Sequence, residues 1–117
     1  MTVKLNERAF EHAKTLITER RFVYDERDAW SEHRPSAAKE NRFIEEHGFE
    51  EYARWYLGID SEASEDTKGH YKFPYADFEA VHRCGVIAAE VRAARLDYED
   101  IQAAAAHLHG MLETLKV

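Results

Sequence analysis

The chain is poor in residues that cross-link or interrupt a fold, and it has no long hydrophobic run. Its 117 residues include one cysteine, Cys84, which excludes an internal disulfide and any multi-cysteine zinc or iron–sulfur site. No apolar stretch approaches the roughly 18 residues that a membrane-spanning helix needs. Two prolines and five glycines form no linker of low complexity. These absences predict a single domain that does not span a membrane.

The chain also has fewer positively than negatively charged residues. The chain carries 16 Lys and Arg residues against 23 Asp and Glu residues, which gives a formal net charge of -7. Such a field repels phosphate backbones, so nucleic acid is not an expected partner. The N-terminal sequence MTVKLNER has no apolar segment of the secretory type. Together with the single thiol, this predicts a cytoplasmic protein.

The familiar catalytic motifs are absent from the sequence. It contains no glycine-rich phosphate loop, no nucleophile elbow, no kinase signature and no His-Glu-x-x-His pair. We therefore expect no cofactor, and the pattern favours a non-catalytic protein over an enzyme. The content of hydrophobic residues, 44%, is sufficient for a packed core.

Hydrophobic periodicity in the first half predicts helices. Asn6 is a suitable N-cap for a first helix at about 7–20, and Ser36 for a second that ends at Gly48. A third helix is expected at about 49–57, with Gly58 closing it. The β-capable residues 21–24 are interpreted as extended chain outside any sheet.

The second half predicts a long central helix at about 78–95, because two apolar stripes run along it side by side. Gly85 lies within it, and glycine costs about 1 kcal/mol relative to alanine in a helix interior. We expect the close approach of another helix or an aromatic ring to compensate. A last helix, capped at Asp97, would form an antiparallel pair with the central one.

The predicted fold is therefore all-α: a compact domain of four to five helices around a buried helix at about 78–95. The whole chain, 1–117, forms this single helical domain. An acidic and aromatic loop at about 59–77 joins its two halves.

Two potential chemical sites fall inside the predicted central helix. Glu79 and His82 stand three residues apart, the spacing that di-iron carboxylate bundles use, although such a site needs a second motif of this kind. The alternative is a surface or capping contact. Cys84 could be a nucleophile, but on a helix His82 would face away from it, which favours a small buried hydrophobe.

Aromatic and cationic residues crowd the stretch 55–83. If the loop folds against the central helix, these side chains would share one wall that binds an anion, an aromatic ligand or a second copy of the chain. The alternative is that the rings close the core of a small domain. The candidate ligand- or partner-binding residues are Trp55, Tyr71, Tyr75, His82 and Arg83.

Three segments together resemble a family of short bacterial proteins of about this length that has no assigned activity. The segments are DAWSEHRPS at 28–36, HGFEEYARWYLG at 47–58 and TKGHYKFPYADFEAVHRC at 67–84. The resemblance implies a free-standing bacterial protein and supplies no reaction, cofactor or catalytic residue.

The functional hypothesis is a small non-catalytic bacterial protein that acts by self-association or by binding a protein partner. The aromatic and cationic residues would form the contact surface. The alternative is a small metal-dependent or small-molecule-binding enzyme that uses Glu79 and His82.

Overall fold

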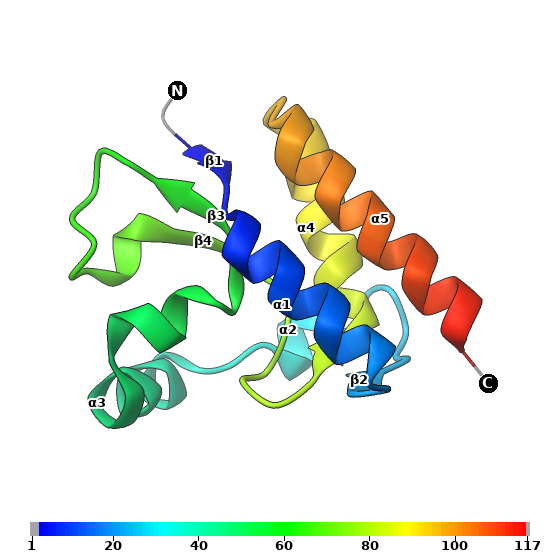
Figure 1. The fold of residues 1–117 in the computed structure, drawn as a ribbon, viewed down its shortest axis with the longest axis horizontal. Coiled ribbons are helices and arrows are strands. Elements are labelled where there is room, and N and C mark those ends of the chain that lie inside the picture. The colour runs from blue at the N-terminus through cyan, green and yellow to red at the C-terminus, as the bar shows by residue number, and fades with distance from the viewer. Residues whose placement is uncertain (1–2, 117) are drawn as a thin grey trace.

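The computed structural model describes residues 3–116 and shows a mixed α/β fold, so the prediction of an all-α domain is wrong (Figure 1). Met1 and Thr2, the first residues of the N-terminal stretch that predicts no secretory signal, lie outside the described residues. The helices are α1 (Glu7–Thr18), α2 (Trp30–His33), α3 (Ala37–Ala53), α4 (Arg83–Arg95) and α5 (Glu99–Leu115). The strands are β1 (Val3–Leu5), β2 (Phe22–Val23), β3 (Tyr56–Asp60), β4 (Tyr71–Pro74) and β5 (Val81–His82), and a short 3-10 turn, η1 (Lys68–His70), precedes β4.

A three-stranded antiparallel sheet with the order β1-β3-β4 replaces the end of the predicted third helix. Leu5 pairs with Gly58, and Gly58 pairs with Lys72 on the other side. Gly58 therefore lies in the middle strand instead of closing a helix. A Cβ atom on Gly58 would lie 2.8 Å from the ring of Phe73, so the missing side chain makes room for that ring.

A second, two-stranded sheet joins distant parts of the chain. Phe22 and Val23 pair in parallel with Val81 and His82. Residues 21–24 thus belong to a sheet, contrary to expectation, and helix α4 begins at Arg83 because the chain before it is a turn and a strand. This pairing brings the start of α4 beside the segment that follows β2.

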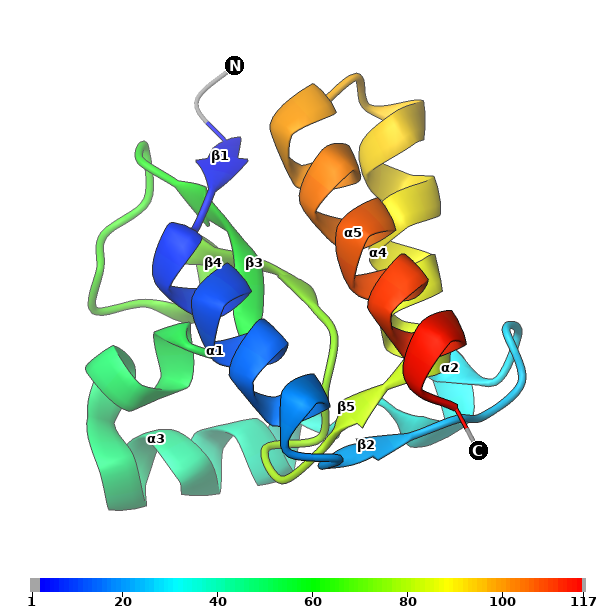
Figure 2. The same ribbon diagram turned by 45° about the vertical axis from the view of Figure 1, so that its right-hand side comes forward.

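The helices enclose the three-stranded sheet from one side. Figures 1 and 2 show α1 crossing in front of β3 and β4, with α4 and α5 side by side next to it. α1 packs against both α5 and β3, and the predicted pairing of the last two helices is confirmed. The largest fully buried side chains come from α1, α3, β3, β5, α4, α5 and the residue after β4: Tyr52, Tyr75, Ile17, Leu57, Ile101, Leu108, Leu112, Val81, Val86 and Cys84.

The central helix is buried over its first turns and exposed toward its end. Cys84, Gly85 and Val86 are buried, whereas Val91 and Leu96 are 36% and 44% exposed. The stretch that was expected to be one buried helix is therefore a turn, a strand and a half-buried helix.

Two helix boundaries were predicted closely. α1 begins directly after Asn6, whose side chain donates to the carbonyl oxygens of Ala53 and Tyr56 instead of capping the helix. Ser36 caps α3 by accepting from the backbone N–H of Lys39, and Gly48 bends that helix with a φ of 82°. Within residues 3–116, none of the helices combines the length and the apolar character needed to cross a bilayer.

Candidate functional site

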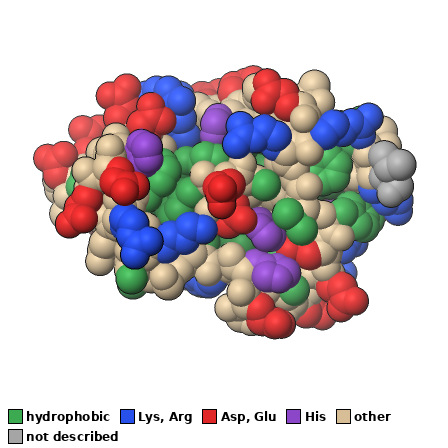
Figure 3. Space-filling view, turned by 90° about the horizontal axis from the view of Figure 1, so that it is seen from below, with side chains coloured by type: hydrophobic (Ala, Val, Ile, Leu, Met, Phe, Trp, Pro, Cys, Tyr) green, Lys and Arg blue, Asp and Glu red, His purple; other side chains and the backbone are tan. Residues whose placement is uncertain are grey.

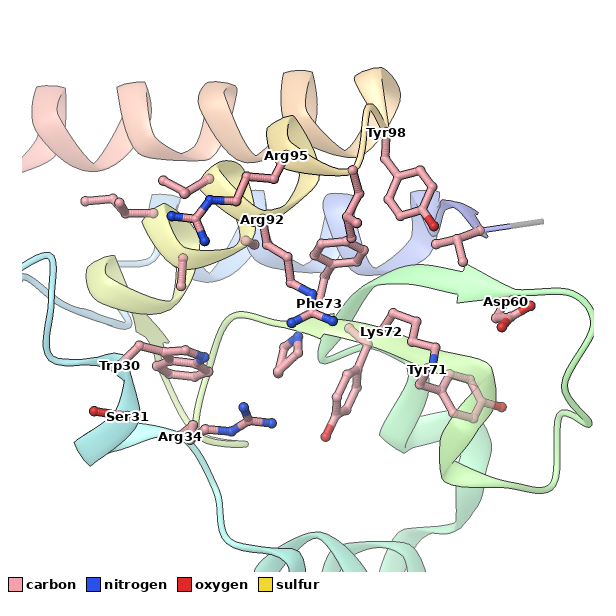
Figure 4. A pocket seen from close by; sticks show the side chains of 18 of the residues that line it. Trp30, Ser31, Arg34, Asp60, Tyr71, Lys72, Phe73, Arg92, Arg95 and Tyr98 are labelled. Carbon is pink, nitrogen blue, oxygen red and sulfur yellow. The ribbon is translucent and has the colours of Figure 1, made fainter. Parts of the chain in front are cut away.

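A cleft of about 1090 Å³ lies between helix α4, strands β3 and β4, and the segment that contains α2. Figure 4 shows Trp30 and Arg34 on one side of it, Arg92 on the opposite side, and strand β4 with Lys72 between them. The cleft is lined by side chains from across the chain: Val3, Arg27, Asp28, Trp30, Ser31, Arg34, Glu40, Tyr52, Tyr56, Asp60, Glu62, Lys68, Tyr71, Lys72, Phe73, Pro74, Ile87, Ala88, Ala89, Val91, Arg92, Arg95, Leu96 and Tyr98.

Basic side chains gather in this cleft although the whole protein is acidic. Six of the lining residues are Lys or Arg and four are Asp or Glu, against a net charge of -7 for the chain. Among residues 3–116, Arg34, Lys72 and Arg92 have no carboxylate within 4.0 Å. These three side chains are therefore available to an anion from outside the protein.

One acidic side chain of the cleft, Glu40, has its charge compensated by neighbouring side chains. Glu40 accepts a hydrogen bond from the hydroxyl of Tyr56 at 2.7 Å and pairs with Lys68 Nζ at 3.0 Å. Burial raises the pKa of Tyr56 well above its usual value and that of Tyr52 to about 12. Both phenols stay protonated at neutral pH, so this end of the cleft presents neutral donors beside a compensated carboxylate.

The indole of Trp30, in α2, packs directly against helix α4. A Cβ atom on Gly85 would lie 2.9 Å from Cζ3 of Trp30 and 2.8 Å from the carbonyl oxygen of Tyr75. The predicted approach of an aromatic ring to Gly85 is thus confirmed. Because no other residue fits at this distance, the glycine allows the indole to lie directly on the helix backbone.

Next to this contact, three side chains converge on the carboxylate of Asp25. Asp25 Oδ2 lies 2.7 Å from Nδ1 of His82 and 2.7 Å from Nδ1 of His33. The thiol of Cys84 donates to the same oxygen at 3.1 Å, and its sulfur lies 3.6 Å from Nδ1 of His33. The donor atoms of Asp25, His33, His82 and Cys84 all lie within 4.8 Å of one another. We call these four residues the Asp25 cluster.

Asp25 also caps helix α4 from outside the helix. Its Oδ1 accepts the backbone N–H of Cys84 at 2.8 Å, and its own carbonyl accepts from Arg83 Nη1 at 3.0 Å. A carboxylate at a helix N-terminus is stabilised by the exposed N–H groups and the helix dipole. The segment after β2 is thereby joined to the first turn of α4.

The electrostatics of the Asp25 cluster follow from these contacts. Burial opposes ionisation of Asp25, but the hydrogen bonds from Cys84, His82 and His33 outweigh it and lower its pKa to about 2. Burial and the adjacent carboxylate raise the pKa of the Cys84 thiol to about 12. The lone thiol is therefore protonated at neutral pH, which disfavours its use as a free nucleophile.

His82 is held at both ring nitrogens. Its Nε2 lies 2.8 Å from Asp77 Oδ2, while Nδ1 faces Asp25. Burial lowers the pKa of His82, but the two carboxylates outweigh this and raise it overall. Asp77 is itself fixed, because its Oδ1 accepts the backbone N–H groups of Glu79 and Ala80.

The geometry predicted for His82 with Glu79 and Cys84 is not observed. Glu79 precedes β5 in an exposed turn and His82 ends that strand, so they share no helix face. The partners of His82 are Asp25 and Asp77, and Glu79 contributes only its backbone. Since His82 is in a strand, its ring and the Cys84 thiol reach the same carboxylate.

The five candidate binding residues fall in four places. Trp55 and Tyr75 are in the core, 8% and 0% exposed, with ring centroids 6.4 Å apart. Tyr71 lines the cleft, and His82 belongs to the Asp25 cluster. Arg83 stacks on the ring of Tyr24 and pairs with Glu113. The structure brings His82 and Arg83 together at Asp25 but does not join all five in one wall.

Sequence reasoning missed Asp25, His33 and Asp77, which complete the surroundings of His82. Asp77 is only 5 residues from His82 in the sequence, whereas Asp25 is 57 residues from it. The spacing of His82 and Cys84 gave no usable signal, because His82 ends a strand and Cys84 lies in the first turn of α4. Figure 3 shows histidine side chains beside hydrophobic ones on the face of the molecule that is seen from below.

Comparison of the chain with protein-family models, curated proteins and solved structures gives no match.

Proposed function

We propose that this protein is a non-catalytic binding protein whose cleft takes a small anion that carries an aromatic ring. The observation that carries the proposal is the gathering of Arg34, Lys72 and Arg92, all without a carboxylate partner among the described residues, in a cleft of an acidic protein. Fixed cations of this kind bind phosphate or carboxylate groups, and arginine does so with two parallel hydrogen bonds.

The ring is proposed from the aromatic side chains in the same cleft. Trp30 is half-buried, with its indole on the backbone of α4, and Tyr98 lies at the other end of that helix (Figure 4). Ligand sites combine apolar and aromatic walls with a few polar groups that fix orientation. A flat anion placed between Trp30 and Arg92 would satisfy both kinds of group.

Titration followed by NMR of the two indole N–H groups tests the proposal. Phenyl phosphate is expected to shift the indole signal of Trp30, which lines the cleft, and to leave that of Trp55, which is 8% exposed in the core. Phenol and inorganic phosphate carry one half of the probe each, and both are expected to bind more weakly. No movement of the Trp30 signal with phenyl phosphate would contradict the proposal.

Variants of the cationic residues sharpen the test. Arg92→Gln and Arg34→Gln are each expected to weaken phenyl phosphate binding by about tenfold, because a charged hydrogen bond contributes about 1.5 kcal/mol. Arg42→Gln removes an exposed arginine of α3 that does not line the cleft, and it serves as the matched control. Equal losses in Arg42→Gln and Arg92→Gln would mean that only net charge matters.

A second candidate is self-association or the binding of a protein partner. The observation that favours it is the exposure of Val91 and Leu96, two apolar residues of the α4 end that border the cleft. Light scattering over a dilution series, with wild type and Leu96→Glu, distinguishes the two. A mass that stays at one chain at every concentration would leave small-ligand binding as the better proposal.

The proposed setting of this binding protein is the bacterial cytoplasm. It is supported by the resemblance of the segments at 28–36, 47–58 and 67–84 to short bacterial proteins and by the single, buried thiol of Cys84. The net charge of -7 supports the view that nucleic acid is not the partner.

A further inference from the structure

We propose that Asp25, His33, His82 and Cys84 form a zinc site that fastens the segment 24–36 to the start of helix α4. This inference concerns a site separate from the anion proposed for the cleft, and it does not depend on that proposal. Two imidazole nitrogens, one thiolate sulfur and one carboxylate oxygen make up the mixed ligand set that Zn²⁺ accepts in proteins.

The four donor atoms already lie close to one another. The separations of the Asp25 carboxylate oxygen from the two histidine nitrogens and the sulfur are 2.7, 2.7 and 3.1 Å, and His33 Nδ1 lies 3.6 Å from the sulfur. Tetrahedral zinc with its usual bond lengths needs ligand separations of about 3.3 to 3.8 Å. The two separations of 2.7 Å must therefore lengthen by about 0.6 Å each. The His33 side chain, 38% exposed, has room to move, and a rotation of the Asp25 carboxylate would lengthen its separation from His82.

The surroundings of His82 are those of a zinc ligand. With Nδ1 directed at the cluster, Nε2 faces the carboxylate of Asp77 at 2.8 Å. Zinc-bound histidines commonly donate their other N–H to a carboxylate, which fixes the tautomer and the orientation of the ring. Asp77 is held in turn by two backbone N–H groups, so a chain of hydrogen bonds fixes the orientation of the His82 ring.

The number of ligands is typical of a structural zinc site and not of a catalytic one. Four protein ligands complete a tetrahedron and leave no open position for water or substrate. On binding, the Cys84 thiol and each histidine Nδ1 that carries a proton release it to solvent, and the metal takes the place of these protons. The site then crosslinks Asp25 and His33, on one segment, to His82 and Cys84 on the other.

Few side chains are buried in the segment that these ligands hold. Among residues 24–36, only Pro35 is buried. Hydrophobic burial therefore contributes little to fixing this stretch, which includes α2 and supplies one wall of the cleft. A metal crosslink stabilises such a segment where a small core cannot.

Cobalt substitution tests the site directly. The purified full-length chain is freed of metal with a chelator and titrated with Co²⁺, then with Zn²⁺. We expect one equivalent of Co²⁺ to give the intense visible bands of a tetrahedral site together with a near-ultraviolet thiolate-to-cobalt band, and one equivalent of Zn²⁺ to abolish both. Zn²⁺ should also raise the melting temperature of the metal-free chain.

Variants identify the ligands. Cys84→Ser is expected to lose the thiolate-to-cobalt band, and His33→Gln, at an exposed position that tolerates change, should weaken Zn²⁺ binding by at least tenfold. Asp77→Asn, which acts through His82, is expected to keep the spectrum and weaken binding by about 10- to 100-fold. His47→Gln removes an exposed histidine outside the cluster and is the control.

Three outcomes would overturn the proposal. The first is an octahedral cobalt spectrum without the thiolate band in the folded wild-type chain. The second is unchanged melting of the metal-free chain after addition of Zn²⁺. The third is equal Zn²⁺ affinity for His33→Gln and His47→Gln. Binding of phenyl phosphate is measured separately, so failure of the zinc site and failure of the cleft proposal are distinguishable.

Discussion

Gly85 lies in the first turns of α4, where the indole of Trp30 and the carbonyl oxygen of Tyr75 both come within 3 Å of the position of a Cβ atom. Real Cβ atoms do not approach backbone atoms this closely, so any side chain here displaces the strand or the indole. The same contact holds α2 against α4. One residue without a side chain thus determines whether the wall of the cleft that carries Trp30 can form.

Gly85→Ala is expected to destabilise the protein by about 1 to 3 kcal/mol, because overpacking outweighs the gain of at most about 1 kcal/mol in helix propensity. The matched control is Gly110→Ala in α5, where a Cβ atom would meet nothing within 4 Å. That variant should stabilise by up to about 1 kcal/mol. Urea unfolding measures both, and stabilisation by both variants would contradict the tight fit of Trp30.

His12 makes a second prediction at the scale of one residue. Its Nε2 is buried without a hydrogen-bond partner among the described residues, and the ring stands edge-on to Trp55. Burial, with the charges of Arg54 and Arg21, lowers its pKa below the usual 6.5, and Glu51 and Glu19 oppose this only in part. Protonation therefore favours the unfolded chain, and the contribution of neutral His12 to stability is lost as the pH falls below 6.5.

We expect the unfolding free energy of the wild type, measured relative to His12→Gln, to decrease between about pH 8 and about pH 5. The variant keeps a neutral polar side chain at every pH, so the difference isolates this one group from the other histidines. Urea unfolding at each pH gives the values. A difference that is constant with pH would show that His12 is protonated as easily in the folded as in the unfolded protein.

At the scale of elements, the long periodic segments were predictable and the short strands were not. α1 and α5 carry apolar residues at helical spacing, and those residues are buried as expected. β1, β2 and β5 have two or three residues each, too few for an alternating pattern to be recognised. Gly58 was taken as a helix end because both a helix terminus and a crowded sheet favour glycine.

The candidate site could be predicted only in part, for a related reason. His82 and Cys84 were recognised as chemically able residues, but the start of α4 was placed at 78 instead of 83. With both residues placed inside a helix, the two side chains were predicted to point away from each other. Asp25 lies 59 residues before its partner Cys84 in the sequence, and no local pattern reveals such a contact.

The contact between Asp25 and α4 makes a prediction for that element. Asp25→Ala removes the acceptor of the Cys84 backbone N–H and is expected to cost about 1 to 3 kcal/mol, the usual loss for a charged hydrogen bond. Hydrogen exchange of the Cys84 amide should accelerate more than that of the Leu108 amide in buried α5. Asp28→Ala, three residues further on and exposed, is the control. Equal effects of the two variants would exclude a capping role.

For the molecule as a whole, the segment 24–36 is one of the stretches with few buried side chains. It contains Arg27 and Arg34, both exposed and outside the helices, so clostripain, a protease that cuts after arginine, is expected to cut there early. If zinc binds at the Asp25 cluster, one equivalent of Zn²⁺ should slow these two cuts and leave the rate of cleavage after the exposed Arg42 unchanged. Peptide mass spectrometry over a time course follows each site, and equal protection of all three would point to a general effect of the metal.

The parallel pairing of β2 with β5 has a consequence for biosynthesis. A chain that leaves the ribosome N-terminus first presents residues 22–25 long before residues 81–84 have been made, so neither the two-stranded sheet nor the carboxylate contact at α4 can exist until then. The same holds for α1, because its neighbour α5 comes much later in the sequence. Nascent fragments of this protein are therefore expected to stay unfolded until both parts of each contact have been synthesised. Neither half of the sequence is expected to fold as an independent unit.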